Sequence, residues 1–410
     1  MKRARGLATL VWLVLFAVGT YGVVLRLTDG LRPTELGSYV VWGLWISVDI
    51  YFIGLSAGAF LLSSLAYVLG VKQLEPVGKL ALFTALVTLL LAMLSAWFDI
   101  GHMERFIYVF LRPNFGSLMT WVIWLYMAYF LLLLTELWLA LRADMAALAG
   151  VEGWRGRLAR LVCLGDTDTS PASVERDHRR LRILGSFGVV LAVAFHGGMG
   201  ALFGSIVARP YWFGPLYPIF FLTGALVSGS ALLLALGAFA WPRHDAAWRE
   251  MLTLLGRVVL ALLAFDVLLE WAEFSIPFWY GVGHELDLLQ TVLFGPFWYV
   301  FWIFHLLLGT IVPLFLLIRW PREPSRLGVA GLLVALTYMA VRLNIVIPGF
   351  VTPAFSGIDQ AFTDPRLTFN YVPSMMEWQV SLFVAMLGVA LFYVGYRVLP
   401  LVGRHKEVSS

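Results

Sequence analysis

The chain has 410 residues, of which 60% are hydrophobic and only 13% are charged, and its mean hydropathy is +0.85. Soluble globular domains carry about 25% charged residues, so this composition excludes a water-soluble domain. The long runs rich in leucine, alanine, valine and glycine favour membrane helices over the alternating strands of a membrane barrel. We therefore predict an all-α polytopic membrane protein.

Ten apolar runs approach or exceed the roughly 20 residues that one membrane crossing requires. The predicted spans cover residues 8–28, 40–70, 78–98, 116–142, 182–207, 215–240, 252–280, 293–319, 326–347 and 377–400. The first run follows basic residues, as in a signal peptide, but it lacks a small-residue cleavage pattern, so we interpret it as a retained anchor.

The basic residues alternate between the two sides of the predicted spans. The N-terminus, every second connection and the C-terminal tail contain 22 of the 29 Lys and Arg residues. The positive-inside rule then predicts that both termini are cytoplasmic. The pI of 9.2 reflects this topology, so we expect contact with the lipid membrane and none with nucleic acid.

Several segments recur in the same order with four spans between the members of each pair. Residues 54–62 resemble 224–232, and the Trp97 to Asp99 segment resembles the Trp271 to Glu273 segment. Phe115-Gly116 and the aromatic residues after it resemble Phe294-Gly295 and those that follow. This pattern predicts two related four-helix bundles, spans two to five and six to nine, flanked by one helix at each end.

We accordingly divide the chain into an anchor, two bundles, a linker, an outer loop and a last helix. The predicted boundaries are 1–37 for the anchor helix, 38–142 for spans two to four, 143–181 for a cytoplasmic linker, 182–207 for the fifth span, 208–347 for the second bundle, 348–376 for the outer loop, and 377–410 for the last helix and tail.

Ionisable side chains inside membrane spans are costly and rare, so they indicate where a function is located. The predicted spans contain Asp49, Asp99, Glu136, His196, Asp266, Glu270, Glu273, His305 and Arg342. Asp49 and His196 lie too deep to reach either surface, which favours contact with a ligand or a proton path. Alternatively, Asp99 and Glu273 are interfacial caps and Arg342 extends outward to the surface. We expect Glu136 to be solvated near the cytoplasmic end.

Three acidic residues of the seventh span share one helix face. Asp266, Glu270 and Glu273 are spaced i, i+4 and i+7. The spacing suits a proton relay toward the outer surface and suits an interhelical polar seam equally well.

The sequence contains no pattern typical of a metal cofactor site. An iron–sulfur cluster needs about four cysteines, whereas Cys163 is the single cysteine. Only His196 and His305 lie inside spans, so we expect neither haem nor an iron–sulfur cluster in this chain. Trp42 and Trp45, which precede Asp49, mark an interfacial belt or line the ring of a quinone.

Residues 39–49, together with Gly54 to Gly58, resemble the signature span of the NrfD/polysulfide-reductase membrane-subunit family. Further matches are 98–102 with Arg105, 115–117, His196 with 199–205, 341–343, and Trp378-Gln379. The resemblance covers about residues 38–400. With ten spans, the chain is most similar to the branch that contains the hydrogenase-2 membrane subunit.

The resemblance implies a cofactor-free subunit of a quinone-dependent oxidoreductase in a prokaryotic cytoplasmic membrane. Such subunits bind menaquinone or ubiquinone near the outer face, beside a ferredoxin-like iron–sulfur subunit. That partner connects them to a molybdopterin enzyme, a hydrogenase or a multihaem cytochrome. The chain alone is then not a complete enzyme.

The residues expected to contact the quinone are Asp49, Trp45, Asp99, Arg105, His196 and Arg342. Those expected to transfer protons are Asp49, Asp99, His196, Glu270 and Glu273. We expect the iron–sulfur partner to dock on the outer connections near 100–117, 207–215, 280–293 and 348–376.

Two other functions fit the same features. Secondary transporters also use duplicated bundles and buried acids, although no predicted span is visibly broken by Gly and Pro at mid-depth. A passive membrane anchor without a quinone site is the second alternative.

Overall fold

The computed structural model describes residues 2–209, 211–242, 244–281, 284–354, 357–362 and 364–402. Across these residues it contains ten helices long and apolar enough to cross a membrane, and no strand. The predicted all-α polytopic fold is therefore confirmed. The spans are α1 (Lys2–Asp29), α2 (Leu44–Tyr67), α3 (Glu75–Asp99), α5 (Leu118–Leu148), α7 (Pro171–Gly204), α8 (Tyr217–Phe239), α9 (Ala246–Tyr280), η3 (Val300–Ile311) continued by α11 (Val312–Arg319), α12 (Pro324–Val351) and α14 (Met375–Val398).

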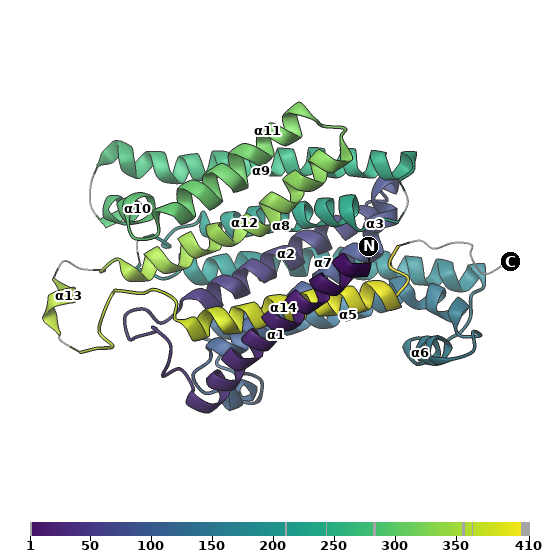
Figure 1. Cartoon of the computed structure of the whole chain (residues 1–410), viewed down its shortest axis with the longest axis horizontal. Helices are drawn as coiled ribbons and strands as arrows, with labels where there is room; N and C mark the ends of the chain where they lie inside the picture. The colour runs from purple at the N-terminus through teal and green to yellow at the C-terminus, as the bar shows by residue number, and fades with distance from the viewer. Residues whose placement is uncertain are drawn as a thin grey trace.

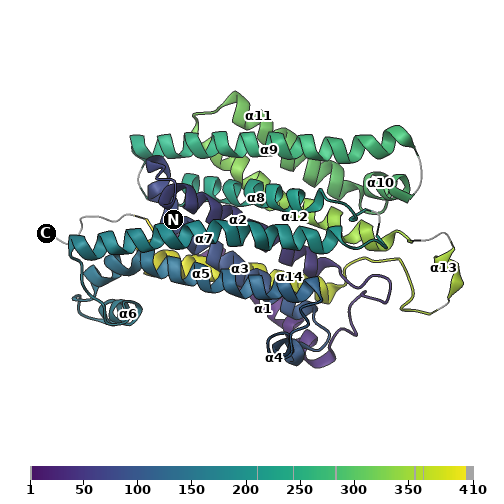
Figure 2. The ribbon, with the colours of Figure 1, turned by 180° about the vertical axis from the view of Figure 1, so that it is seen from behind.

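Shorter helices lie at the two ends of this bundle. Figures 1 and 2 show α10 (His284–Phe294) and α13 (Ile358–Ala361) at one end and α6 (Trp154–Val162) at the other. After the predicted orientation, we call the first the outer end and the second the inner end. Helix α4 (Tyr108–Leu111), labelled in Figure 2, lies in the connection between α3 and α5 at the lower edge of the bundle. The start of α1 and the last turn of α14 both lie toward the inner end (Figure 1).

The centre of the bundle is formed by α2 and α8. Helices α3, α7, α8 and α12 all pack against α2, while α9 and α12 pack against α8. Helices α1 and α14 pack along each other and α14 contacts α3, so the pair covers one flank of the bundle (Figure 1). The relation of the halves by an internal duplication stays a prediction.

Two glycines allow the backbones of α2 and α8 to touch. A Cβ atom on Gly58 would lie 2.0 Å from the carbonyl oxygen of Ala225, and one on Gly229 would lie 2.5 Å from the amide nitrogen of Ala59. Small residues permit this close approach in membrane helices, where packing rather than water exclusion drives association. The two segments that resemble each other in sequence, 54–62 and 224–232, therefore meet at the centre of the fold.

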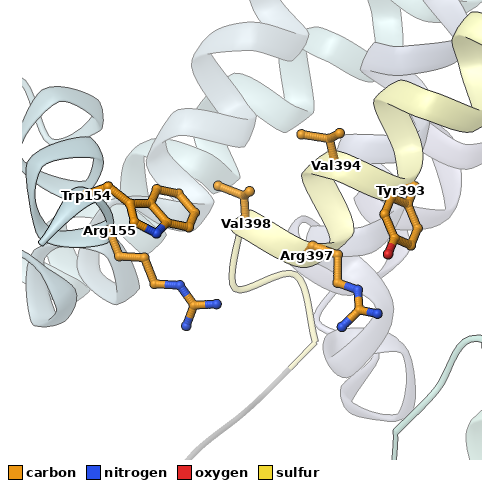
Figure 3. Close-up of a pocket in the computed structure, with 6 residues that line it drawn as sticks. All are labelled: Trp154, Arg155, Tyr393, Val394, Arg397 and Val398. Carbon is orange, nitrogen blue, oxygen red and sulfur yellow. The ribbon is translucent and has the colours of Figure 1, made fainter.

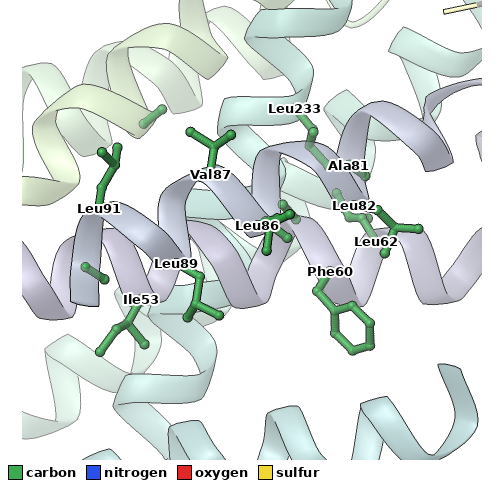
Figure 4. Close-up of a cluster of buried hydrophobic side chains, with 14 of the residues drawn as sticks. Ile53, Phe60, Leu62, Ala81, Leu82, Leu86, Val87, Leu89, Leu91 and Leu233 are labelled. Carbon is green, nitrogen blue, oxygen red and sulfur yellow. The ribbon is translucent and has the colours of Figure 1, made fainter. Parts of the chain in front are cut away.

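Apolar side chains fill the space around this contact. Figure 4 shows Phe60 of α2, Leu82 and Leu89 of α3, and Leu233 of α8, all of which are fully buried. Their packing holds α3 against α2 and places the carboxyl end of α3 beside the outer start of α2. That arrangement brings polar residues of both helices to the outer end.

The fifth span begins earlier than the sequence predicts, at Pro171 instead of residue 182. The hydroxyl of Ser170 accepts a hydrogen bond from the amide of Ser173 at 3.3 Å, and Pro171 occupies the first turn, both of which favour a helix start. Arg142, fully buried, pairs with Asp177 and donates to Ser173 Oγ at 2.8 Å. These contacts give the polar segment after α5 a defined structure.

The eighth span begins later than predicted, at Val300 instead of residue 293. Residues before Gly295-Pro296 form the separate helix α10, because proline disfavours helical backbone in the residue before it. The span then starts as a π-helix, η3, and Pro313 of α11 has no N–H to donate within the helix. The π-helix was not predicted.

Candidate functional site

Asp49 lies on α2 close to the outer end. It is five residues from Leu44, the first residue of α2, which places it about 8 Å along the helix. Because the helix begins at Leu44 and not at residue 40, where the predicted span begins, Asp49 lies nearer the outer end than the sequence predicts. Its side chain is buried, and the hydroxyl of Tyr126 on α5 donates to Asp49 Oδ1 at 3.3 Å. The structure therefore joins a carboxylate and a phenol from two spans.

Asp99, at the end of α3, lies close enough to Asp49 for the two carboxylates to interact electrostatically. Its Oδ1 atom is buried and has no hydrogen-bond partner among the described residues. Arg26 of α1, only 2% exposed, donates to the carbonyl oxygens of Phe98 at 2.8 Å and Ile100 at 2.7 Å and interacts electrostatically with Asp99. We call Asp49, Tyr126, Asp99 and Arg26 the Asp49 centre.

Glu377 completes the outer side of this centre. It is buried in the first turn of α14, where it forms a capping box with Ser374, and Tyr371 donates to its carboxylate. Burial, reinforced by Glu377, raises the pKa of the Tyr371 phenol, which lies in the loop before α14. Sequence reasoning missed Glu377, although the Ser-x-x-Glu pattern at a helix start indicates such a cap.

Trp45 is buried one turn before Asp49. Its Nε1 donates to the Glu377 carbonyl oxygen at 3.0 Å, and the guanidinium of Arg26 lies 5.8 Å from its ring centroid. The tryptophan therefore connects α2 with α14 and forms one wall of the Asp49 centre.

Aromatic side chains gather at the outer start of α5. Phe110 lies 5.8 Å from Trp124, and Phe115 lies 5.2 Å from Trp121 and 5.7 Å from Trp124, between ring centroids. Trp121 and Trp124 are exposed at the surface that would face lipid. This aromatic cluster lies on the same helix end as Tyr126.

His196 lies one turn further inward, between α7 and α2. Its Nδ1 is 2.9 Å from the Ala192 carbonyl oxygen and its Nε2 is 3.0 Å from that of Ile53. A neutral imidazole donates through only one of these nitrogens. Both nitrogens face backbone carbonyls, so in this structure His196 links two helices and presents no ring nitrogen to a ligand.

Arg105 is not brought to the Asp49 centre. Its side chain is 63% exposed, in η2 (Met103–Ile107), and its Nε lies 3.9 Å from Glu104. The residue is therefore placed on the outer surface.

A second group of polar residues lies between α9, η3 and α12. His305 Nε2 is 2.8 Å from Glu270 Oε1, and Tyr338 donates to Asp266 Oδ2 at 2.9 Å. These four residues border a small cavity with room for about one water molecule. His305 Nδ1 is buried without a hydrogen-bond partner in the part of the chain the structure describes. We call these four residues the His305 centre.

The π-helix helps to build the His305 centre. The side-chain hydroxyl of Thr310 donates to the carbonyl oxygen of His305 at 3.1 Å, and Gly309 lines the same cavity. Segments of π-helix are rare and occur frequently at functional sites. Local sequence did not indicate it.

Arg342 lies between the two centres. It is 1% exposed, so the alternative in which it extends to the surface is wrong. Its guanidinium lies 5.0 Å from the ring centroid of Phe221 and 5.2 Å from that of Tyr338, and it interacts electrostatically with both Asp266 and His196. Its Nε has no hydrogen-bond partner among the described residues.

Glu273 and Glu136 lie apart from these clusters. Glu273 is partly buried and interacts electrostatically with Tyr211 in the connection between α7 and α8. The pKa of Tyr211 is raised first by burial and then by this carboxylate. Glu136, expected to be solvated, is instead 2% exposed, because α7 packs over it at Gly185 and Gly188. Within the described residues, no three His, Cys, Asp or Glu side chains are grouped to hold a metal ion.

Comparison with known proteins places these features in a family. The sequence model described as polysulphide reductase, NrfD, matches residues 33–354. A selenate reductase subunit of Mesobacillus selenatarsenatis is 38% identical over 96% of this chain and 93% of its own length.

Two further relatives have names that mention a quinone. The Hdr-like menaquinol oxidoreductase integral membrane subunit of Archaeoglobus fulgidus is 27% identical over 94% of this chain and 91% of its own. The menaquinone reductase integral membrane subunit of Nitratidesulfovibrio vulgaris is 24% identical over 97% and 91%. The resemblance inferred from residues 39–58 is thus confirmed: the chain belongs to the NrfD polysulphide reductase family.

Proposed function

We propose that the chain is the quinone-interacting membrane subunit of a respiratory oxidoreductase complex. The main support for this proposal is the Asp49–Tyr126 hydrogen bond, which lies near Asp99, whose Oδ1 has no hydrogen-bond partner among the described residues. Small-molecule sites combine apolar walls with a few polar groups that fix the ligand, and the Asp49 centre has this composition. The two relatives named for menaquinol and menaquinone favour menaquinone over ubiquinone.

The Asp49 centre has the chemistry that quinone turnover requires. A quinone exchanges two protons along with two electrons when it interconverts with its quinol. Asp49 holds or releases a proton at a carboxylate oxygen, Tyr126 orients that carboxylate, and Trp45 forms an apolar wall. Asp99 lies next along the path to the outer end and passes the proton to the outer water.

The His305 centre provides a second proton path within the same proposal. The 2.8 Å contact between His305 and Glu270 suits direct proton exchange, and the adjoining cavity has room for a connecting water. Glu273, one turn nearer the outer end on α9, interacts electrostatically with Tyr211 in the connection between α7 and α8. We therefore favour the relay over the purely structural polar seam.

We propose that the iron–sulfur partner docks on the outer end. The Arg209 guanidinium fixes the loop between α7 and α8 by donating to the carbonyl oxygens of Gly349 at 3.1 Å, Thr352 at 3.2 Å and Tyr39 at 3.3 Å. The ring of Tyr39 stacks on that of Phe369, with 4.5 Å between the ring centroids. These contacts join three outer connections into one surface for the partner. The excess of basic residues at the inner end supports our proposal that this end faces the cytoplasm.

The test compares Asp49→Asn and Tyr126→Phe in the purified complex. Asp49→Asn removes the proton-binding group, so we expect quinol turnover to fall by about 100-fold or more. Tyr126→Phe removes the hydroxyl that orients Asp49 and should have a smaller effect in the same direction.

Tyr129→Phe is the matched control, since Tyr129 is buried one turn further along α5 and its hydroxyl lies 3.5 Å from the Ser56 carbonyl oxygen. Wild-type turnover in Asp49→Asn would remove the Asp49 centre from the reaction. Substrate flux into liposomes that contain this chain alone would favour the transporter function. If the purified complex binds no quinone, the chain is a passive membrane anchor.

A further inference from the structure

A groove opens at the inner end of the fold, between α6 and the last turns of α14. It has a volume of about 270 Å³, and none of the residues discussed above for quinone or proton chemistry borders it. Its lining, drawn in Figure 3, consists of Trp154, Arg155, Tyr393, Val394, Arg397 and Val398.

Two arginines supply positive charge from opposite sides of the groove. Figure 3 shows the guanidinium groups of Arg155 and Arg397 extending to the same side. Neither forms an ion pair within the described part of the chain, whereas Arg142, at the same end, pairs with Asp177 and Asp166. The charge of the groove is therefore available to an anionic ligand.

The rest of the lining suits hydrocarbon. Tyr393 and Val394 are exposed on α14, a helix whose length and composition predict that it spans the membrane, so these side chains would face lipid. Trp154 is exposed on α6, and its ring lies 5.5 Å from the Arg155 guanidinium. Aromatic and basic side chains combined in this way are typical of the membrane–water interface.

Helix α6 has the orientation and the two faces of an interfacial helix. Figures 1 and 2 show it nearly end-on, whereas the spans run across the picture, so α6 lies crosswise to them. Gly156 and Ala159 are buried against the protein, while Arg155, Arg157 and Leu161 are exposed. Such helices lie in the plane of the interface and are attracted to anionic lipids.

From this juxtaposition we propose that the groove binds an anionic phospholipid, with its phosphate between Arg155 and Arg397 and its acyl chains along Val394 and Val398. Basic pockets beside membrane helices on the cytoplasmic side bind such head groups. The bound lipid connects the segment between α5 and α7 to the last span. The site does not depend on the proposed quinone function.

The double variant Arg155→Gln/Arg397→Gln tests the proposal in the full chain, purified in mild detergent. Native mass spectrometry measures phosphatidylglycerol binding, with phosphatidylcholine as the neutral probe and inorganic phosphate as the head-group probe. Each arginine beside an anionic surface contributes a factor of about five, so the double variant should bind phosphatidylglycerol about 25-fold more weakly. Phosphatidylcholine and inorganic phosphate should bind weakly to every variant.

Arg322→Gln is the matched control, because Arg322 is an exposed arginine in the turn between α11 and α12 at the same end. The variant Arg155→Lys/Arg397→Lys keeps the charge and should retain most of the affinity, and an unchanged thermal unfolding midpoint of the Gln variant shows that its loss of binding is not misfolding. Equal phosphatidylglycerol binding by wild type and the Gln variant would overturn the proposal. Equal wild-type affinity for phosphatidylcholine, or tight binding of inorganic phosphate alone, would overturn it as well.

Discussion

The two polar centres differ in which buried group has no hydrogen-bond partner in the described part of the chain and in what lies beside that group. In the Asp49 centre, the carboxylate accepts from Tyr126, Arg26 is bound to two carbonyls, and one oxygen of Asp99 is unpaired among the described residues. In the His305 centre, a ring nitrogen is likewise unpaired beside a water-sized cavity. The first arrangement suits fixing a ligand near the outer end, and the second suits moving protons through water. We expect the two centres to respond differently to substitution.

Glu270→Gln separates the roles of the two centres, because it tests quinol turnover and quinone affinity independently. It removes the carboxylate that faces His305 while keeping the side-chain volume, so quinol turnover should fall by about 100-fold with quinone affinity unchanged. Steady-state turnover and a quinone-binding titration on one preparation measure both quantities.

Glu323→Gln, an exposed glutamate in the turn before α12, is its control and should change neither quantity. A loss of quinone affinity in Glu270→Gln equal to its loss of turnover would mean that the His305 centre binds the quinone itself.

Gly58→Ala tests whether the central contact of α2 and α8 holds the two centres in place. The added Cβ would meet the Ala225 carbonyl oxygen, so we expect the free energy of unfolding to fall by about 1–3 kcal/mol. Gly197→Ala on α7 is the control, because apart from its own helix backbone no atom of the described residues lies within 4 Å of its Cβ position. Thermal unfolding of both variants measures the difference, and Gly58→Ala should unfold at the lower temperature. Equal unfolding midpoints would contradict the close contact of α2 and α8.

The smallest expected effect is a slow alkylation of Cys163, which tests the packing at the inner end. Burial raises the pKa of its thiol, so less thiolate is present at any given pH and alkylation should be slower than for a free cysteine between about pH 7 and 9. Leu161→Cys in a Cys163→Ser background places an exposed thiol in the same segment for comparison. Equally fast alkylation of the two would show that the segment around α6 is not packed as described.

The ten spans could be predicted from the sequence because each membrane crossing requires a long apolar run, whichever helices it packs against. Sequence reasoning also identified Asp49, Asp266, Glu270 and Arg342 as residues inside the spans, since charge inside such runs is rare. It could not reveal that Tyr126 faces Asp49, because the pairing depends on how α2 and α5 pack.

Other parts of the site come from segments that local sequence describes poorly. Arg26 and Glu377 belong to the flanking helices α1 and α14, and they approach Asp99 through the packing of α1 on α14 and of α14 against α3. His196 was predicted to hold the quinone, but its two carbonyl contacts depend on the approach of α2 to α7. Its predicted role stays a prediction.

The most direct test of the central claim is to locate the quinone by crosslinking. A photoreactive menaquinone analogue, irradiated with the purified complex and followed by peptide mapping, should label α2 or α5 near Asp49 and Tyr126. Asp49→Asn should weaken that labelling, whereas Tyr129→Phe should leave it unchanged. Labelling confined to α9 and η3 around His305, or equal labelling in Asp49→Asn and wild type, would contradict the account.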